Sequence, residues 1–118
     1  MQPLKLLIVD DHKVARDALV ERLDNEADIQ VKGVPATGPE VLNEAMNENP
    51  QVVLLDIKSC SVNGMNLCRD LVNNKKVKVI VLTSCLSIEE IEELKECGVE
   101  SYLFKDLDLD SLLEMIRS

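Results

Sequence analysis

Residues 4–12 read LKLLIVDDH, an apolar segment interrupted only by Lys5 and closed by two carboxylates. A strand buried on both faces has this composition, and such strands belong to parallel sheets covered by helices on both sides. Residues 4–9 are therefore predicted to form a central strand. Asp10 and Asp11 come just past its C-terminal end.

Strands and helices alternate along the rest of the chain. Residues 29–34 alternate polar and apolar, as an edge strand does, whereas the other strand candidates are apolar runs. Helices between the strands are indicated by apolar residues at helical spacing. The predicted strands are 4–9, 29–34, 52–55, 77–82 and 102–104, and the predicted helices are 14–23, 37–48, 67–74, 87–97 and 109–117.

Helix ends carry local signals. Thr37 with Glu40, and Ser87 with Glu90, have the spacing of a capping box, and Gly98 suits a left-handed C-cap. Five β-α units of this size predict a doubly wound α/β sheet, because right-handed crossovers place helices on both of its faces.

Polar residues stand at the ends of four of these strands. They are Asp10, Asp11, Asp56, Thr83 and Lys105. Ligands of open parallel sheets bind outside the carboxyl ends of the strands, so we expect these side chains to converge. Three carboxylates, a hydroxyl and an ammonium describe a site for a divalent cation and a phosphoryl group.

Length and composition set bounds on the class of protein. The 118 residues fit one domain, 1–118, with 46% hydrophobic and 30% charged residues. No apolar run is long enough to span a bilayer, and residues 1–5 lack the features of a signal peptide, so a cytoplasmic location without membrane contact is expected. The four cysteines show no CxxC pairing and are expected to be reduced.

The net charge of −9 includes five glutamates within residues 89–96. This charge repels DNA, so the domain itself is not expected to bind nucleic acid. We interpret the acidic run as a solvated helix face, with partner docking as the alternative. Dinucleotide and flavin binding are not expected, because the first strand leads into carboxylates instead of a phosphate-binding loop.

Taken together, these residues resemble the response-regulator receiver domains of two-component signalling, across essentially the whole chain. The matching features are Asp10-Asp11, Asp56 with Gly64 eight residues later, Thr83-Ser84, and the segment from Gly98 to Lys105. VDDH at 9–12 and YLFKD at 102–106 are most similar to the NarL/LuxR-like subfamily, whose receivers precede a helix-turn-helix DNA-binding domain. The resemblance implies a flavodoxin-like (βα)5 fold with strand order 2-1-3-4-5.

The expected cofactor is Mg²⁺, which takes oxygen ligands and usually only one or two protein carboxylates. Asp11 and Asp56 suit direct ligation. The resemblance adds the Lys58 backbone carbonyl as a third ligand and gives Asp10 a role through water. Three carboxylates this close repel one another, which favours binding of a cation.

Asp56 is the candidate phosphoacceptor, because a carboxylate can attack phosphorus. Lys105 would add positive charge, and Thr83 would hydrogen-bond a phosphoryl oxygen. Their simpler interpretations are a solvated surface lysine and a strand-end hydroxyl bonded to backbone. The resemblance implies that the Tyr102 ring turns inward when Thr83 moves, with plain packing as the alternative.

Some positions depart from the family pattern. Cys60 stands where a proline is usual in the loop after Asp56, and Asp106 replaces a common proline after Lys105. Lys58 and Cys85 occupy positions at which the family tunes hydrolysis of the acyl phosphate. A long cation at Lys58 predicts a long-lived phosphorylated state.

The implied partner is a sensor histidine kinase, with homodimerisation on phosphorylation through the first and fifth helices or through the fourth helix and fifth strand. DNA is expected to be contacted only through an output domain outside residues 1–118, so a fragment of a longer regulator is favoured over a stand-alone receiver. A turnover enzyme is not expected, because a haloacid-dehalogenase-type phosphatase needs a second aspartate where Lys58 stands. The remaining alternative is a phosphorylation-independent docking or dimerisation module.

Overall fold

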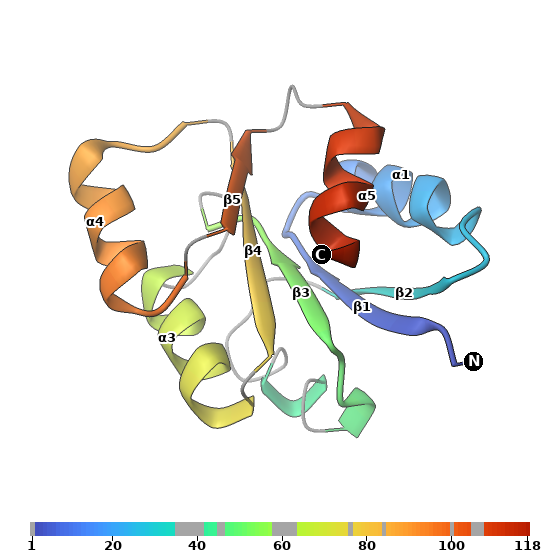
Figure 1. Ribbon diagram of the computed structural model, residues 1–118, viewed down its shortest axis with the longest axis horizontal. Helices are drawn as coiled ribbons and strands as arrows, with labels where there is room; N and C mark the ends of the chain where they lie inside the picture. The colour runs from blue at the N-terminus through green and yellow to red at the C-terminus, as the bar shows by residue number, and fades with distance from the viewer. Residues whose placement is uncertain are drawn as a thin grey trace.

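A computed structural model describes residues 2–34, 42–44, 47–57, 64–75, 77–83, 85–99, 101–104 and 108–118. Within them lies a five-stranded parallel sheet of order β2-β1-β3-β4-β5, which confirms the predicted doubly wound topology (Figure 1). The strands are β1 (Leu4–Val9), β2 (Ile29–Val34), β3 (Val52–Leu55), β4 (Lys78–Thr83) and β5 (Ser101–Phe104).

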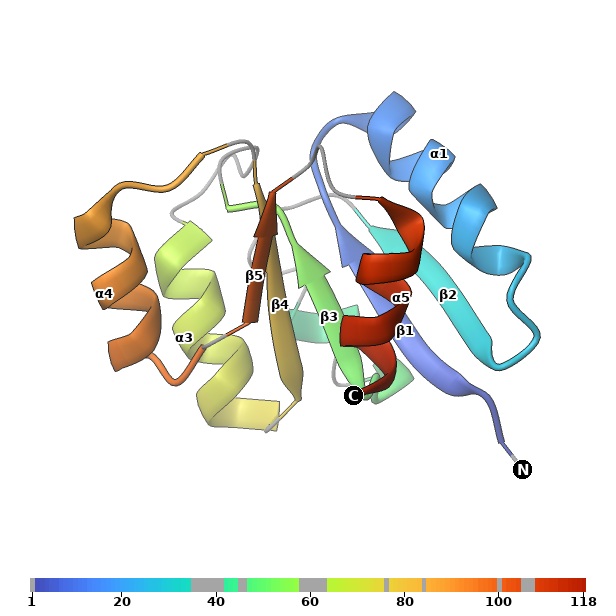
Figure 2. The ribbon, with the colours of Figure 1, turned by 45° about the horizontal axis from the view of Figure 1, so that its top comes forward.

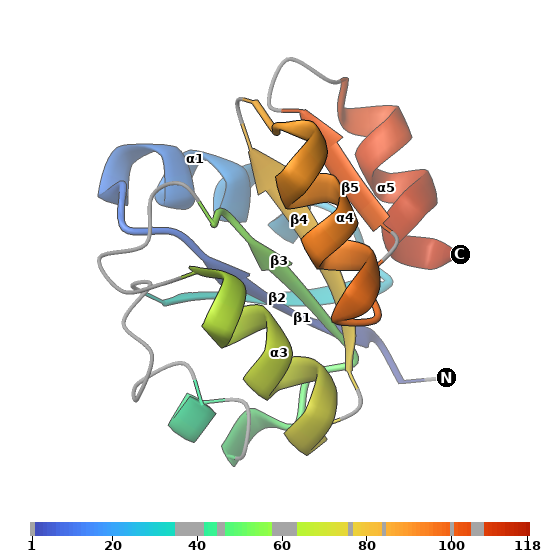
Figure 3. The ribbon, with the colours of Figure 1, turned by 90° about the vertical axis from the view of Figure 1, so that its left-hand side faces the viewer.

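Helices cover both faces of the sheet. One face carries α1 (Lys13–Asp24) and α5 (Leu109–Arg117), and the other carries α3 (Gly64–Lys75) and α4 (Ile88–Glu96). Figures 1 and 3 show this three-layer arrangement from two directions. The β1, β3 and β5 arrowheads reach the same edge of the sheet in Figure 2, so the carboxyl ends of the strands form one rim.

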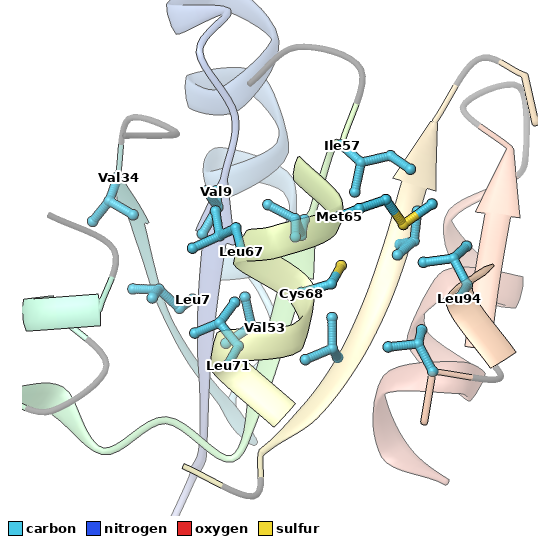
Figure 4. Close-up of a cluster of buried hydrophobic side chains, with 14 residues drawn as sticks. Leu7, Val9, Val34, Val53, Ile57, Met65, Leu67, Cys68, Leu71 and Leu94 are labelled. Carbon is cyan, nitrogen blue, oxygen red and sulfur yellow. The ribbon is translucent and has the colours of Figure 1, made fainter. Parts of the chain in front are cut away.

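The two faces of β1 and β3 both bury apolar side chains, as their unbroken apolar sequences predict. Leu7 and Val9 join the cluster under α3 and α4, whereas Leu6 and Ile8 join the cluster under α1 and α5. Figure 4 shows the first cluster, in which Leu67, Cys68 and Leu71 of α3 pack against β1 and β3. These two cores hold the strands that end in the acidic residues.

The predicted boundaries of β1, β2, β3 and α5 match the structure. Strand β4 is shifted by one residue, beginning at Lys78 and ending at Thr83, because Lys78 pairs with Val52 and Thr83 pairs with Phe104 in the parallel register. Strand β5 starts at Ser101, one residue before the predicted start, and α3 extends from Gly64 to Lys75. Residues 42–44 and 47–48 are helical, but the predicted helix start at Thr37 and Glu40 lies outside the described residues.

Both predicted signals on α4 are confirmed. The Ser87 hydroxyl accepts the Glu90 N–H at 3.1 Å, and the Glu90 carboxylate accepts the Ser87 N–H at 2.9 Å. At the other end Gly98 has φ 91°, with Gly98 N–H bonded to the Lys95 carbonyl and Val99 N–H bonded to the Leu94 carbonyl. This pair of bonds is a Schellman motif, which turns the chain from α4 toward β5.

Candidate functional site

Two acidic positions lie side by side at the rim of the sheet. Val9 and Leu55 are register partners, and the Asp56 N–H donates to the Val9 carbonyl at 3.1 Å. Neighbouring strands are about 4.8 Å apart, so the Asp10 and Asp56 backbones are adjacent. Asp10 is 7% exposed and Asp56 3% exposed. The structure therefore places two nearly buried acidic residues at adjacent strand ends; that their carboxylates share a site stays a prediction.

The turn after β1 holds Asp10 in a defined orientation. Its carboxylate accepts the His12 N–H at 2.8 Å, and the His12 Nδ1 lies 3.4 Å from the same oxygen. The Asp10 N–H donates to the Val34 carbonyl of β2 at 3.3 Å. Asp11 lies between these anchored neighbours and is partly exposed at the rim.

Thr83 is the last residue of β4 and is fully buried. Its hydroxyl donates to the Cys85 carbonyl at 3.3 Å, which is the backbone-bonded arrangement that the sequence left open. The bond is longer than the usual O–H···O range of about 2.5–3.0 Å. A role for this hydroxyl at a phosphoryl group stays a prediction, and it requires the hydroxyl to leave the Cys85 carbonyl.

Tyr102 lies on β5, the strand that pairs with β4. It is the register partner of Val81, is half-buried, and packs against the cluster under α3 and α4. Its ring meets the Phe104 ring edge to face, with centroids 6.4 Å apart and planes at 75°. Phe104 is 42% exposed, so this aromatic pair extends from the core to the surface at β5.

The two predicted basic contributors, Lys58 and Lys105, lie outside the described residues, together with Cys60 and Asp106. Their assigned functions stay predictions. The described cysteines Cys68, Cys85 and Cys97 are all free thiols.

The donor set fits a hard cation. Among the described residues no group of three or more His, Cys, Asp or Glu is placed to hold a metal ion. Magnesium does not need such a group, since it usually takes one or two carboxylates and completes its octahedron with other oxygens and water. Asp11 and Asp56 are oxygen donors at the ends of neighbouring strands, which suits this mode of binding.

The sequence did not draw attention to Arg16, a residue of α1 that contacts the turn after β1. Its Nη1 donates to the Asp10 carbonyl at 2.7 Å. A basic residue six positions after the aspartate was the only sequence signal for this contact.

Comparison with known proteins agrees with this geometry. Residues 6–117 match the response regulator receiver domain family. The chain belongs to that family. Receivers of this kind are the response-regulator components of two-component systems.

Curated relatives include the response regulator protein VraR of Staphylococcus saprophyticus, 30% identical over 119 residues. The match covers 98% of this chain and 56% of that relative, so the chain spans about half the length of the curated relatives it matches. VraR of Staphylococcus aureus is 28% identical over 115 residues, covering 97% of this chain and 55% of the relative.

Solved receiver structures superimpose closely. A CheY-like response regulator receiver domain protein of Methanospirillum hungatei is 28% identical with a TM-score of 0.88, covering 98% of this chain and 92% of that one. The BeF3-activated N-terminal receiver domain of Klebsiella pneumoniae RstA is 28% identical with a TM-score of 0.85, covering 96% and 95%. A LuxR-family DNA-binding response regulator of Staphylococcus aureus, at 23% identity and TM-score 0.85 over 97% and 96%, shows the same fold.

In the described part of the chain, every helix is too short or too polar to cross a bilayer.

Proposed function

We propose that residues 1–118 form one receiver domain that takes a phosphoryl group onto the Asp56 carboxylate and passes the change to a partner surface. The observation that carries the proposal is the position of Asp56. It is a nearly buried carboxylate at the end of β3, beside the acidic pair that follows β1.

In the proposed reaction an Asp56 carboxylate oxygen attacks phosphorus. An O–P bond forms, and the P–N bond to a phosphohistidine of the kinase breaks, with the electron pair staying on the imidazole nitrogen. Burial of Asp56 limits access of water to the product. Phosphoryl transfer depends mainly on positioning and on charge stabilisation.

The residues proposed to hold Mg²⁺ are Asp11, Asp56 and the Lys58 carbonyl, with Asp10 acting through water. The bound ion would supply positive charge against the phosphoryl oxygens. Lys105 is proposed to add a second positive charge. The position of Asp10, Asp11 and Asp56 at the ends of neighbouring strands supports a shared cation site.

Thr83 and Tyr102 are the proposed link to the surface. The long bond between the Thr83 hydroxyl and the Cys85 carbonyl can be exchanged for a bond to a phosphoryl oxygen at small cost. Tyr102 then changes its packing beside Phe104, and the equilibrium between two arrangements of the α4 and β5 surface shifts. Lys58 is proposed to slow hydrolysis, giving a long-lived phosphorylated state.

The output is proposed to be control of transcription. The curated relatives are response regulators of about twice this length, and one matched structure is a DNA-binding regulator of the LuxR family. DNA would be contacted by an output domain, the phosphodonor would be a sensor histidine kinase, and phosphorylation would promote homodimerisation. The domain itself is proposed to act in the cytoplasm. The domain would not turn over exogenous substrates.

A phosphorylation-independent docking module is the second candidate. The exposed apolar side chains of Ile88 and Phe104, 74% and 42% exposed, favour a contact surface at α4 and β5. Such a surface serves either mode of action, so phosphorylation itself must be tested.

Intact mass after incubation with a small-molecule phosphodonor separates the two candidates. We expect one added phosphoryl group that requires Mg²⁺ and is missing in Asp56→Asn. A folded protein that gains no mass would favour the docking module. Measuring the decay of the added mass tests the long-lived state, and rapid loss would reject it.

A further inference from the structure

Arg16 connects α1 to the backbone of the acidic turn. Its Nη1 donates to the Asp10 carbonyl at 2.7 Å, and its own N–H donates to the His12 carbonyl at 2.9 Å. The first of these is a short, charge-assisted hydrogen bond, a class roughly twice as strong as a neutral bond. Arg16 is only partly exposed, so its stem is packed while its guanidinium reaches the rim.

Gly33 makes room for that stem. A Cβ on Gly33 would lie 3.0 Å from the Arg16 Cγ, 3.2 Å from the Arg16 Cδ and 3.1 Å from the Val20 Cγ2. Residue 33 lies on β2 and is the register partner of Ile8. The arginine stem therefore crosses the sheet where the strand has no side chain, and a larger residue would push the stem away.

With this bond, Asp10 is held at three points. Its N–H donates to the Val34 carbonyl, its carbonyl accepts Arg16, and its carboxylate accepts the His12 N–H. Asp11 follows directly, between Asp10 and His12, whose backbone groups make these bonds. The contact from α1 thus bears on the orientation of both carboxylates of the pair.

We propose that Arg16 is a positioning residue of the acidic site, and that Gly33 is the position that admits it. Through the Asp10 carbonyl, Arg16 sets the direction in which Asp10 and Asp11 face the cation. The expected effect on Mg²⁺ affinity rests on the proposed function. The effect of Arg16 on the turn at Asp10 can be tested without the metal.

Arg16→Met is the sharpest variant, because it keeps an unbranched stem over Gly33 and removes only the donor. Isothermal titration calorimetry should show Mg²⁺ binding weakened by about tenfold, the low end for residues that orient metal ligands. Arg16→Lys, which can still donate to a carbonyl, should recover part of the affinity. Arg22→Met, on the same helix, is the matched control and should bind like the unmodified chain.

A double-mutant cycle tests the part played by Gly33. Gly33→Ala should weaken Mg²⁺ binding by displacing the Arg16 stem. In an Arg16→Ala background the same change should have a much smaller effect, since two of the three nearest contacts of the added Cβ, those with the Arg16 stem, are then absent. Equal fold losses in both backgrounds would overturn the pairing of the two residues.

Amide hydrogen exchange of His12, followed by NMR without metal, tests the orientation directly. The His12 N–H is bonded to the Asp10 carboxylate, so Arg16→Met should speed its exchange while the urea midpoint stays near that of the unmodified chain. Unchanged His12 exchange, or faster exchange with unchanged Mg²⁺ affinity, would overturn the proposal. Failure of the unmodified chain to bind Mg²⁺ would instead reject the proposed function, and His12 exchange alone would then decide whether Arg16 orders the turn.

Discussion

Replacing Thr83 by valine should separate phosphorylation from the response to it. The substitution keeps the buried shape and removes one hydroxyl, whose 3.3 Å bond to the Cys85 carbonyl is long. A neutral hydrogen bond contributes about 0.5–1.5 kcal/mol, and this one belongs at the low end. Cys85 is an exposed residue and the bond is only partly buried, which keeps the cost of losing it small. We therefore expect the free energy of unfolding to change by only about 0.5 kcal/mol.

The effect on signalling should be much larger. In Thr83→Val, residue 83 has no hydroxyl to bond a phosphoryl oxygen. Tyr102 should therefore pack against Phe104 as it does in the unphosphorylated protein, even when Asp56 carries the phosphoryl group. The chain provides its own probe, since Tyr102 is the only tyrosine and there is no tryptophan. Tyrosine emission therefore reports on this one ring.

The assay follows tyrosine emission and intact mass together after Mg²⁺ and a phosphodonor are added. The unmodified chain and Thr83→Ser should gain mass and change emission, and Thr83→Val should gain mass with little change in emission. Asp56→Asn controls for effects of the reagents. Equal emission changes in Thr83→Val and the unmodified chain, at equal phosphorylation, would refute the link from Thr83 to Tyr102.

Three further predictions concern stability, measured by urea unfolding. Ser87→Ala removes the cap of α4 and should cost about 1 kcal/mol, and an unchanged midpoint would contradict it. Gly98→Ala should lower the free energy of unfolding by about 1–2 kcal/mol, because a Cβ is strained at φ 91°. Gly98→Asn should lower it by less, and equal losses in the two variants would contradict this reason. The bidentate bond from Arg117, at 2.7 and 2.8 Å, lowers the pKa of Asp28 below its ordinary 3.8. The stabilisation from the charged Asp28 is present above pH 3.8 and is lost as the pH falls through the lowered pKa. Asp28→Asn should therefore lower the urea midpoint at pH 7 and have the same midpoint as the unmodified chain in strong acid. A difference in midpoint that is the same at both pH values would count against this explanation.

Local patterns predicted the elements well because each depends on neighbours in sequence. The strand at 4–9 is determined by its own apolar residues, and the start of α4 is determined by the nearby pair Ser87 and Glu90. The ends of the strands were predicted less accurately than the strands themselves. The apolar character of Val77 extended the predicted fourth strand too early, whereas pairing of Lys78 with Val52 sets the true start. The order of the strands came from the family resemblance and not from any local pattern.

Contacts between distant residues were not predictable in the same way. Lys78 donates to the Met115 carbonyl at 2.7 Å, and Arg117 bonds Asp28, because α5 packs across the sheet. The bond from Arg16 to the Asp10 carbonyl depends on the missing side chain of Gly33 on another strand. Spacing along the chain does not predict such contacts, because they depend on how the helices pack on the sheet.

For the candidate site, the sequence predicted which side chains follow the strands, and the structure places Asp10, Asp11 and Asp56 at one rim. The acceptor that the Thr83 hydroxyl bonds could not be predicted, because the acceptors within reach of a buried hydroxyl are known only from the folded structure. The contributions of Lys58 and Lys105 remain predictions from the family resemblance.

The most direct test of the central claim is to identify the residue that carries the phosphoryl group. Borohydride reduces an acyl phosphate to the alcohol, so a phosphorylated aspartate becomes homoserine. Trypsin cleavage after Lys32 and Lys58 yields a peptide in which Asp56 is the only aspartate, while Asp10 and Asp11 fall in the peptide after Lys5. We predict homoserine at position 56 alone, and only when Mg²⁺ was present. Homoserine at position 10 or 11, or at no position in a folded sample, would contradict the assignment of Asp56 as phosphoacceptor.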